Sequence, residues 1–217
     1  FDPIPNTWYK MLDILLYWAS KGVDGVRCDM AEMVSTAFWH WAIEQVKKAH
    51  PAMIFIAEVY NPWEYKHYVE AGFDYLYDKV GMYDTMRGVI CGNCPTSQIT
   101  TAWQWVDKIS NHMLYFLENH DEQRIASDYF AGDGFRAYPA LAVNMLMRSN
   151  PFMVYAGQEY GERGMDSEGF SGKDGRTTIF DYWTVPSLHR ALVAKKSTAD
   201  EHKLSTMYDR ILSIAST

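Results

Sequence analysis

Three acidic residues stand where apolar, strand-like runs of the sequence end. Asp29 closes the run Val23–Asp29, Glu58 follows the run Met53–Ala57, and Asp121 follows the run Met113–Leu117 after three residues. Side chains at the carboxyl ends of neighbouring parallel strands converge on one edge, where parallel α/β folds build their sites. We therefore expect these carboxyl groups to face one pocket, where they suit metal ligation, paired acid–base chemistry, or both.

A basic residue accompanies the first of these acids. Arg27 and Asp29 are two apart in a strand-like run, so their side chains point to the same face and can meet. Charges at the end of a buried strand are expensive unless they are paired or used. The pair is therefore either a structural ion pair that closes a strand, or an arginine that keeps a reactive carboxylate ionised and aimed.

Glycoside hydrolysis suits these residue types better than metal chemistry. One carboxylate attacks the anomeric carbon while a second, protonated carboxyl group delivers a proton to the leaving oxygen. Glu58 follows an apolar strand, whose desolvation favours the protonated acid. A metal centre would use more histidines, and His120 is the one histidine at a strand end. We predict no metal site.

Two aromatic residues follow Glu58 and can stack on sugar rings. They are Tyr60 and Trp63, in a chain whose aromatic content is 15% with 8 Trp and 15 Tyr. Packing in the core or at the rim of a site explains these two side chains equally well. The aromatic signal is thus compatible with a carbohydrate partner.

Alternating apolar runs and amphipathic patterns must position these residues, and they predict an α/β fold with parallel strands. The expected strands are Val23–Asp29, Met53–Ala57, Gly72–Tyr77, Met113–Leu117 and Pro151–Ala156. The expected helices are Thr7–Lys21 (capped by Asn6 or Thr7), Thr36–His50 (capped by Ser35 or Thr36), Glu64–Ala71, Ser97–Ile109, Phe135–Arg148, Ser187–Lys196 and Glu201–Ala215. Lys79–Cys94 and Gly161–Thr177 are expected to be loop-rich.

Composition excludes several classes of partner. The 217 residues carry a net charge of −7, which argues against nucleic acid and anionic membranes. No apolar run reaches the ~20 residues of a membrane span, and no signal sequence opens the chain. The chain begins at Phe1 without an initiator Met, so we expect it to be a piece of a longer protein.

The three cysteines do not form a disulfide framework. Cys91 and Cys94 have the spacing of half a zinc site or a redox pair, but no second Cys pair or His pair completes it. A loop with free thiols is the better interpretation.

Three short motifs resemble the alpha-amylase family (glycoside hydrolase family 13), whose catalytic domain is a (β/α)8 TIM barrel. They are Gly25-Val-Arg-Cys-Asp29, Ala57-Glu-Val-Tyr60 and Glu118-Asn-His-Asp121, in the family's order and spacing. Tyr155-Ala-Gly-Gln-Glu159 is similar to the family's strand-eight segment. The resemblance runs from about Pro5 to Asp181.

The resemblance assigns roles to the residues that match the motifs. It implies that Asp29 is the nucleophile, Glu58 the general acid/base and Asp121 the acid that stabilises the transition state. It implies that Arg27 orients the nucleophile and that His120 hydrogen-bonds the bound sugar. It further implies a retaining enzyme that cleaves α-glucans or malto-oligosaccharides through a covalent glycosyl–Asp29 intermediate.

The chain departs from the family in what it lacks. The strand-three motif, strands one to three, the inserted small domain and the terminal β-sandwich are absent from the sequence. Residues 1–217 thus correspond to one truncated barrel domain, from helix three to helix eight, with about five parallel strands. Glu32 and Met33 stand where amylases often carry Lys-His on the leaving-group side, which argues against endo-acting starch hydrolysis. The family's calcium needs ligands from missing segments, so no cofactor is predicted.

These departures give several expectations. We expect the isolated chain to be inactive and to associate with itself through open sheet edges. A transglycosylase of the same family and a non-catalytic glucan-binding fragment are the alternatives, and a metal-dependent barrel hydrolase ranks third.

Overall fold

A computed structural model of the chain describes residues 1–167, 169–182 and 184–216. The chain divides into two compact units, and each is described by itself. The first unit comprises Phe1–Val80 and Val106–Leu114, and the second comprises Gly81–Trp105 and Tyr115–Thr217.

Five strands pair in chain order, and every neighbouring pair is parallel. This arrangement, with helices between successive strands, confirms the predicted α/β fold with the order of a partial (β/α)8 barrel. Each strand is shorter than the apolar run that predicted it. The strands are β1 (Gly25–Cys28), β2 (Ile54–Ala57), β3 (Tyr75–Tyr77), β4 (Met113–Phe116) and β5 (Phe152–Met153).

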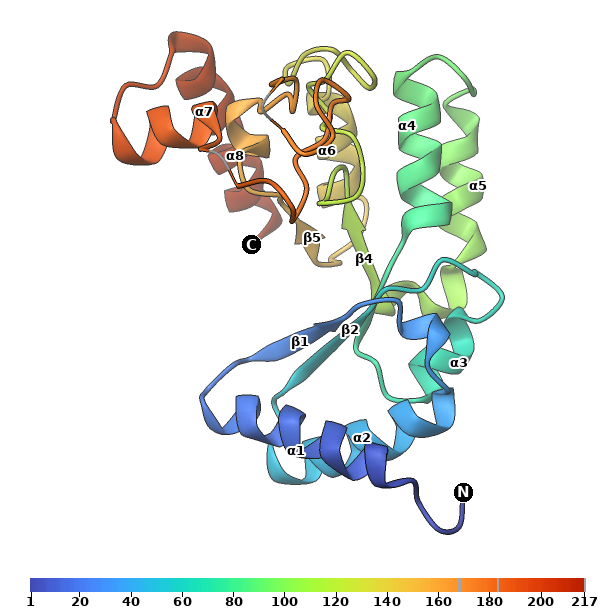
Figure 1. Ribbon diagram of the computed structural model, residues 1–217. Coiled ribbons are helices and arrows are strands. Elements are labelled where there is room, and N and C mark those ends of the chain that lie inside the picture. The colour runs from blue at the N-terminus through green and yellow to red at the C-terminus, as the bar shows by residue number, and fades with distance from the viewer. Residues whose placement is uncertain (168, 183, 217) are drawn as a thin grey trace. The chain divides into compact units, whose positions relative to one another are not determined.

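Helices α1 (Asn6–Ser20) and α2 (Thr36–Ala49) pack against each other in the first unit, on one side of β1 and β2 (Figure 1). Trp8 joins them, with ring centroids 5.4 Å from Phe38 and 5.7 Å from Trp41. Ser35 caps α2 by accepting a hydrogen bond from the Ala37 amide, as predicted. The predicted cap of α1 is wrong, because Asn6 is already helical and Pro5 stands at the cap without a side-chain bond.

A buried aromatic cluster and the Asp74 carboxylate join α2, β2 and the start of β3 in the first unit. The unit also contains η1 (Ala31–Met33), α3 (Tyr65–Glu70) and η3 (Asp107–His112). Phe73 packs edge-on against Trp39 and Phe55, at centroid distances of 5.1 and 6.4 Å. Asp74 accepts a hydrogen bond from the Phe55 amide and pairs with Lys47, each at 2.8 Å. The start of β3 is therefore held to α2 and β2 by the aromatic packing of Phe73 and by the hydrogen bond and ion pair of Asp74.

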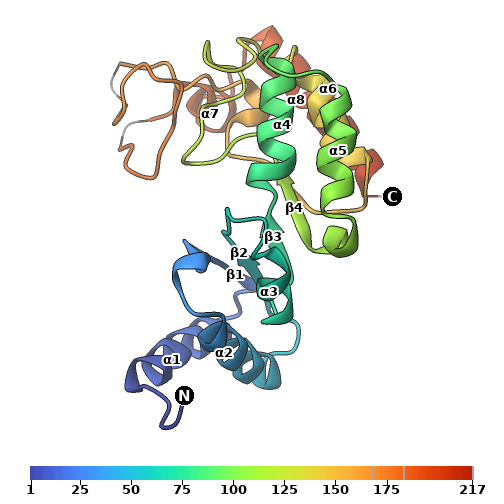
Figure 2. The ribbon, with the colours of Figure 1, turned by 90° about the vertical axis from the view of Figure 1, so that its right-hand side faces the viewer.

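The segment Lys79–Cys94, predicted to be loop-rich, is mostly helical. It forms a π-turn, η2 (Lys79–Tyr83), and then α4 (Asp84–Ile90), which lies beside α5 (Ser97–Trp105) as a helical hairpin (Figure 2). Tyr83 is buried and stacks on Phe116 at 5.0 Å, so tertiary packing outweighs the weak local helix signal. Gly88 permits the hairpin to close, since a Cβ there would stand 2.8 Å from Cys94 Sγ.

The rest of the second unit is built on two longer helices. These are α6 (Tyr138–Leu146) and α8 (Ala199–Ala215), joined by η4 (Gln158–Tyr160), α7 (Pro186–Leu188) and η5 (His189–Val193). Thr198 and Glu201 form a capping box at the start of α8. The segment 161–177 has no helix or strand where it is described; Glu168 lies outside the described residues. Within the described part of the chain, no helix is long and apolar enough to cross a membrane.

Candidate active site

The register of β1 and β2 brings two acids to adjacent strand ends. The pairing runs from Gly25 opposite Ile54 to Cys28 opposite Ala57. The Glu58 amide continues it by donating to the Cys28 carbonyl at 3.1 Å. Asp29 and Glu58 are the next residues on their strands, so parallel pairing places both at the carboxyl edge of the sheet.

Arg27 binds both acids with one guanidinium group. Its Nη1 donates a hydrogen bond to Asp29 Oδ1, and its Nη2 lies 2.9 Å from Glu58 Oε1 as an ion pair. The guanidinium also lies over the Tyr77 ring, 5.3 Å from the centroid. Burial opposes its charge, but the bond to Asp29 and the neighbouring Tyr77 and Glu58 raise the pKa of Arg27 above its ordinary value. The predicted meeting of Arg27 and Asp29 is confirmed, and the second contact joins the two acids.

The two carboxylates differ in access to solvent. The Asp29 side chain is 75% exposed, whereas that of Glu58 is 4% exposed. Glu58 accepts hydrogen bonds from the Tyr60 hydroxyl on Oε1 at 2.8 Å and from the Met30 amide on Oε2 at 2.7 Å. The Glu58 carboxylate is thus buried, and hydrogen bonds hold both of its oxygens.

The turn after β1 directs the Met30 amide to Glu58. Met30 has a φ of 43°, the left-handed region that residues other than Gly rarely adopt. Such backbone strain is concentrated at functional sites. The sequence held no signal for this amide, because its conformation departs from what methionine prefers.

Tyr60 and Trp63 take different positions. Tyr60 is half-buried with its hydroxyl on Glu58, so it contacts a candidate catalytic acid. Trp63 is 76% exposed, and its amide donates to Asn61 Oδ1 at 3.2 Å. Sugar stacking by either ring stays a prediction.

His120 and Asp121 follow β4 in the second unit. Asn119 Oδ1 accepts hydrogen bonds from the amides of Asp121 and Glu122, both at 2.9 Å, which fixes the turn. His120 Nε2 lies 3.4 Å from Asp121 Oδ2, and the Asp121 side chain is 53% exposed. The turn therefore presents an accessible carboxylate beside an imidazole.

A buried ion pair that sequence reasoning missed supports this turn. Arg124 Nη1 lies 2.9 Å from Glu118 Oε1, and both side chains are at most 1% exposed. Arg124 also donates to the Ala156 carbonyl at 2.8 Å and stacks on Tyr155 at 4.1 Å. Burial raises the pKa of Glu118 to about 6, against the opposing charge of Arg124. The position of Glu118 directly after an apolar strand could have indicated a buried, paired acid. No local sequence pattern indicates that Arg124 is its partner.

The predicted site residues divide between the two units. Arg27, Asp29, Glu58, Tyr60 and Trp63 belong to the first unit, and His120 and Asp121 belong to the second. The structure brings Arg27, Asp29, Glu58 and Tyr60 into direct contact. The convergence of all three acids stays a prediction.

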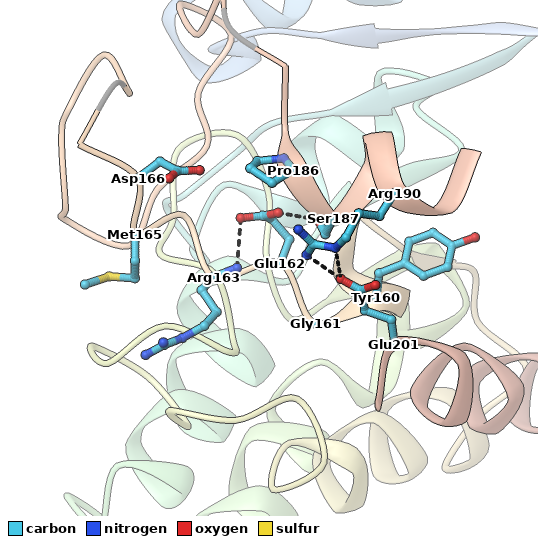
Figure 3. A pocket seen from close by; sticks show the side chains of 10 residues that line it. All are labelled: Tyr160, Gly161, Glu162, Arg163, Met165, Asp166, Pro186, Ser187, Arg190 and Glu201. Carbon is cyan, nitrogen blue, oxygen red and sulfur yellow. Dashed lines mark hydrogen bonds and ion pairs between the residues drawn. The ribbon is translucent and has the colours of Figure 1, made fainter. Parts of the chain in front are cut away.

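The second unit also contains a polar cavity of about 270 Å³ (Figure 3). Glu162 accepts hydrogen bonds from the Ser187 hydroxyl and from the Arg163 amide, the latter at 3.0 Å. Arg190 pairs with Glu201, which also holds the start of α8. Arg190 and Glu201 neutralise each other, and the Ser187 hydroxyl and main-chain amides hold Glu162, so these groups connect the surrounding loops. None of the predicted site residues lines the cavity.

The described residues hold neither a disulfide nor a cluster of metal-binding side chains. All three cysteines are free; Cys28 is buried, Cys91 Sγ donates to the Phe130 carbonyl and Cys94 Sγ to that of Thr85. Among the described residues, no group of three or more His, Cys, Asp or Glu side chains is arranged to hold a metal ion.

Comparison with known proteins gives one family. The sequence profile of the alpha-amylase catalytic domain matches residues 4–214. Alpha-amylase MalA of Haloarcula japonica is 33% identical over 170 residues, which cover 76% of this chain and 24% of that protein. The alpha-1,4-glucan:maltose-1-phosphate maltosyltransferase of Cereibacter sphaeroides is 27% identical over 146 residues, covering 65% of this chain and 23% of that protein.

Solved structures show the same fold. An alpha-amylase from Lactobacillus plantarum superposes with a TM-score of 0.63 at 25% identity, covering 89% of this chain and 48% of that one. A cyclomaltodextrinase gives a TM-score of 0.71 at 19% identity, covering 98% of this chain and 34% of that one. The chain spans about a quarter of the length of these curated relatives and half or less of the solved chains.

Proposed function

Because the chain belongs to the alpha-amylase family, we propose that Asp29 and Glu58 are the nucleophile and the general acid/base of a retaining enzyme that acts on α-glucosidic bonds. The substrate is an α-glucan or a malto-oligosaccharide. The chain spans 24% of the length of the Haloarcula japonica relative, so the proposed activity is that of the whole protein.

The proposed reaction has two displacements. Asp29 attacks the anomeric carbon while Glu58 protonates the departing glycosidic oxygen, which leaves a covalent glycosyl–Asp29 ester. Glu58, now ionised, removes a proton from water as the water attacks the ester carbon, and Asp29 departs. Two inversions return the original configuration. Retention requires the two carboxyl groups to be only about 5–5.5 Å apart.

The observation that carries this proposal is the shared guanidinium of Arg27. It contacts one oxygen of an exposed carboxylate and one oxygen of a buried carboxylate at adjacent strand ends. Asp29 is open to a substrate, whereas Glu58 is desolvated and held by the Tyr60 hydroxyl. A structural ion pair needs one acid, and this arrangement supplies two in unlike environments, as acid and nucleophile require.

Asp121 and His120, in the second unit, are proposed as groups that bind the sugar. We assign Asp121 to neighbouring sugar hydroxyls in the transition state and His120 to a hydrogen bond with the same sugar. Tyr60 and Trp63 are proposed as aromatic contacts of the substrate. The accessible turn that Asn119 fixes is compatible with these roles.

Transfer to a sugar acceptor is the second candidate activity. The Cereibacter sphaeroides relative is a maltosyltransferase, and the same glycosyl intermediate passes to water or to an acceptor. A fragment that binds glucan without cleaving it would have no use for an intact pair of acids.

The test measures nitrophenol release from nitrophenyl α-maltoside. It compares wild type with Asp29→Asn and with the control Asp24→Asn, an exposed acid immediately before β1. The protein is made both as residues 1–217 and from the full open reading frame that encodes them. We expect activity in the longer product, its loss in Asp29→Asn alone, and no activity in the shorter chain.

Proton NMR of the first product tests retention, and added maltose distinguishes transfer from hydrolysis. An α-configured product supports the two-step mechanism, and a β-configured product rules it out. Full activity of Asp29→Asn would refute the assignment of the nucleophile.

A further inference from the structure

We propose that Glu32 is a positioning residue that holds Glu58 in place for proton transfer. Glu32 lies in η1, the turn after β1, and is half-buried. It does not contact Glu58 in the structure, so its effect acts through the chain that follows β2. This inference rests on the proposed function, because it assigns Glu58 the part of general acid.

The Glu32 carboxylate binds the main chain just beyond Glu58. Its Oε2 accepts hydrogen bonds from the Tyr60 amide at 3.1 Å and from the Asn61 amide at 3.0 Å. Hydrogen bonds to an ionised acceptor are roughly twice as strong as neutral ones. One side chain on the first turn therefore secures two consecutive amides of the second turn.

A bond in the opposite direction completes the link. The Met30 amide, in the turn that carries Glu32, donates to Glu58 Oε2 at 2.7 Å. The turn after β1 thus donates one hydrogen bond to Glu58, which follows β2, and accepts two hydrogen bonds from the amides of Tyr60 and Asn61. Three hydrogen bonds therefore join the two turns, and Glu58 accepts one of them.

Tyr60 transmits this restraint to the acid. Its amide is held by Glu32, while its hydroxyl donates to Glu58 Oε1 at 2.8 Å. Without Glu32, two amides lose their acceptor and the segment is free to shift, because unsatisfied donors seek water or other partners. A shift of Tyr60 would withdraw its hydroxyl and change the orientation of the Glu58 carboxyl.

Two substrates with the same donor sugar test this inference. Maltotriose loses glucose, which must be protonated to depart, whereas α-maltosyl fluoride loses fluoride without a proton. The readout is kcat/KM, which reports the steps up to the covalent intermediate. It is measured on the protein from the full open reading frame, for wild type, Glu32→Ala, Glu32→Gln and the control Glu44→Ala, an exposed glutamate on α2.

We expect Glu32→Ala to lower kcat/KM on maltotriose about 10- to 100-fold, part of the roughly 10²–10⁴-fold that general acid catalysis supplies. On α-maltosyl fluoride the loss should stay within about threefold, since that step needs no acid. Glu32→Gln should recover most of the loss, because its amide oxygen accepts the same two bonds. Glu44→Ala should match wild type on both substrates.

Other outcomes overturn the inference. Equal losses on both substrates would mean that Glu32 only maintains the fold, and no loss on maltotriose would mean that the link is dispensable. Failure of the proposed function is distinct: wild type would then cleave neither substrate. In that case amide hydrogen exchange decides the link itself. Glu32→Ala must speed exchange at Tyr60 and Asn61, and unchanged exchange would refute it.

Discussion

Replacement of Arg27 by methionine tests the energetics of the site without any substrate. Methionine keeps much of the side-chain volume but removes the charge, the contacts with Asp29 and Glu58, and the cation–π contact with Tyr77. The two acids then lose their shared partner. Their environments differ, so the effects of the two lost contacts should differ as well.

The magnitude follows from exposure. The Asp29 side chain is 75% exposed, so its lost contact should lower the free energy of unfolding by at most about 1 kcal/mol. The Glu58 side chain is 4% exposed. At a pH where Glu58 is ionised, removal of its buried partner typically lowers the free energy of unfolding by about 3–5 kcal/mol. Arg27 is itself 24% exposed, and Glu58 keeps the Tyr60 and Met30 bonds. We therefore expect a total loss of about 2–3 kcal/mol.

Urea unfolding followed by tryptophan fluorescence measures this loss. The second variant, Arg27→Met with Glu58→Gln, removes the buried charge too. The glutamine side chain at position 58 can accept a hydrogen bond from the Met30 amide and donate one to the Tyr60 hydroxyl. We therefore expect a free energy of unfolding within about 1 kcal/mol of wild type. Asp29→Asn, the exposed control, should change stability by less than about 1 kcal/mol. A loss below about 0.5 kcal/mol for Arg27→Met, or no recovery in the double variant, would refute the reasoning.

Three further predictions concern other parts of the chain. Burial raises the pKa of Glu118 to about 6, above the ordinary 4.5, so between these pH values the folded protein keeps a proton that the unfolded chain releases. The contribution of Glu118 to the free energy of unfolding therefore falls as pH rises from 4.5 to about 6. Carbon NMR of the carboxyl group should show a titration midpoint near 6, and a midpoint at or below 4.5 would contradict this. Gly88→Ala should be less favourable by about 1–2 kcal/mol in the wild type than in a Cys94→Ala background, because its Cβ would meet Cys94 Sγ although alanine itself favours the helix. Thermal melts measure this difference, and equal effects in the two backgrounds would contradict the close contact. Residues 1–217 should oligomerise with rising concentration in light scattering, because in the described part of the chain β1 and β5 each pair with one strand, and a monodisperse monomer would argue otherwise.

Local patterns were sufficient for the strands, most helices and the meeting of Arg27 with Asp29. That contact follows from the alternation of side chains along a strand, which places residues two apart on the same face, and the apolar run was enough to predict the strand. The contact of Arg27 with Glu58 depends on the register of β1 against β2, which no local pattern encodes. The Glu32 link spans 28 residues to Tyr60 and depends on the same register.

Other features were missed because packing overrides local preference. η2 and α4 form despite Gly81 and Gly88, since Tyr83 is buried against Phe116. Met30 adopts a left-handed conformation that its residue type disfavours. Arg124 is held by groups from three separate segments of the second unit, so its importance emerges only when the chain is folded.

The buried thiol of Cys28 in β1 can report how often the strand that leads to the candidate nucleophile opens locally. Cys28 lies between Arg27 and Asp29 and is 7% exposed, and burial raises the pKa of its thiol to about 12. A thiol in that state reacts with alkylating reagents only when the strand separates from its surroundings. After the more accessible Cys91 and Cys94 are changed to serine, the rate at which Cys28 is alkylated measures how often β1 opens in the native protein.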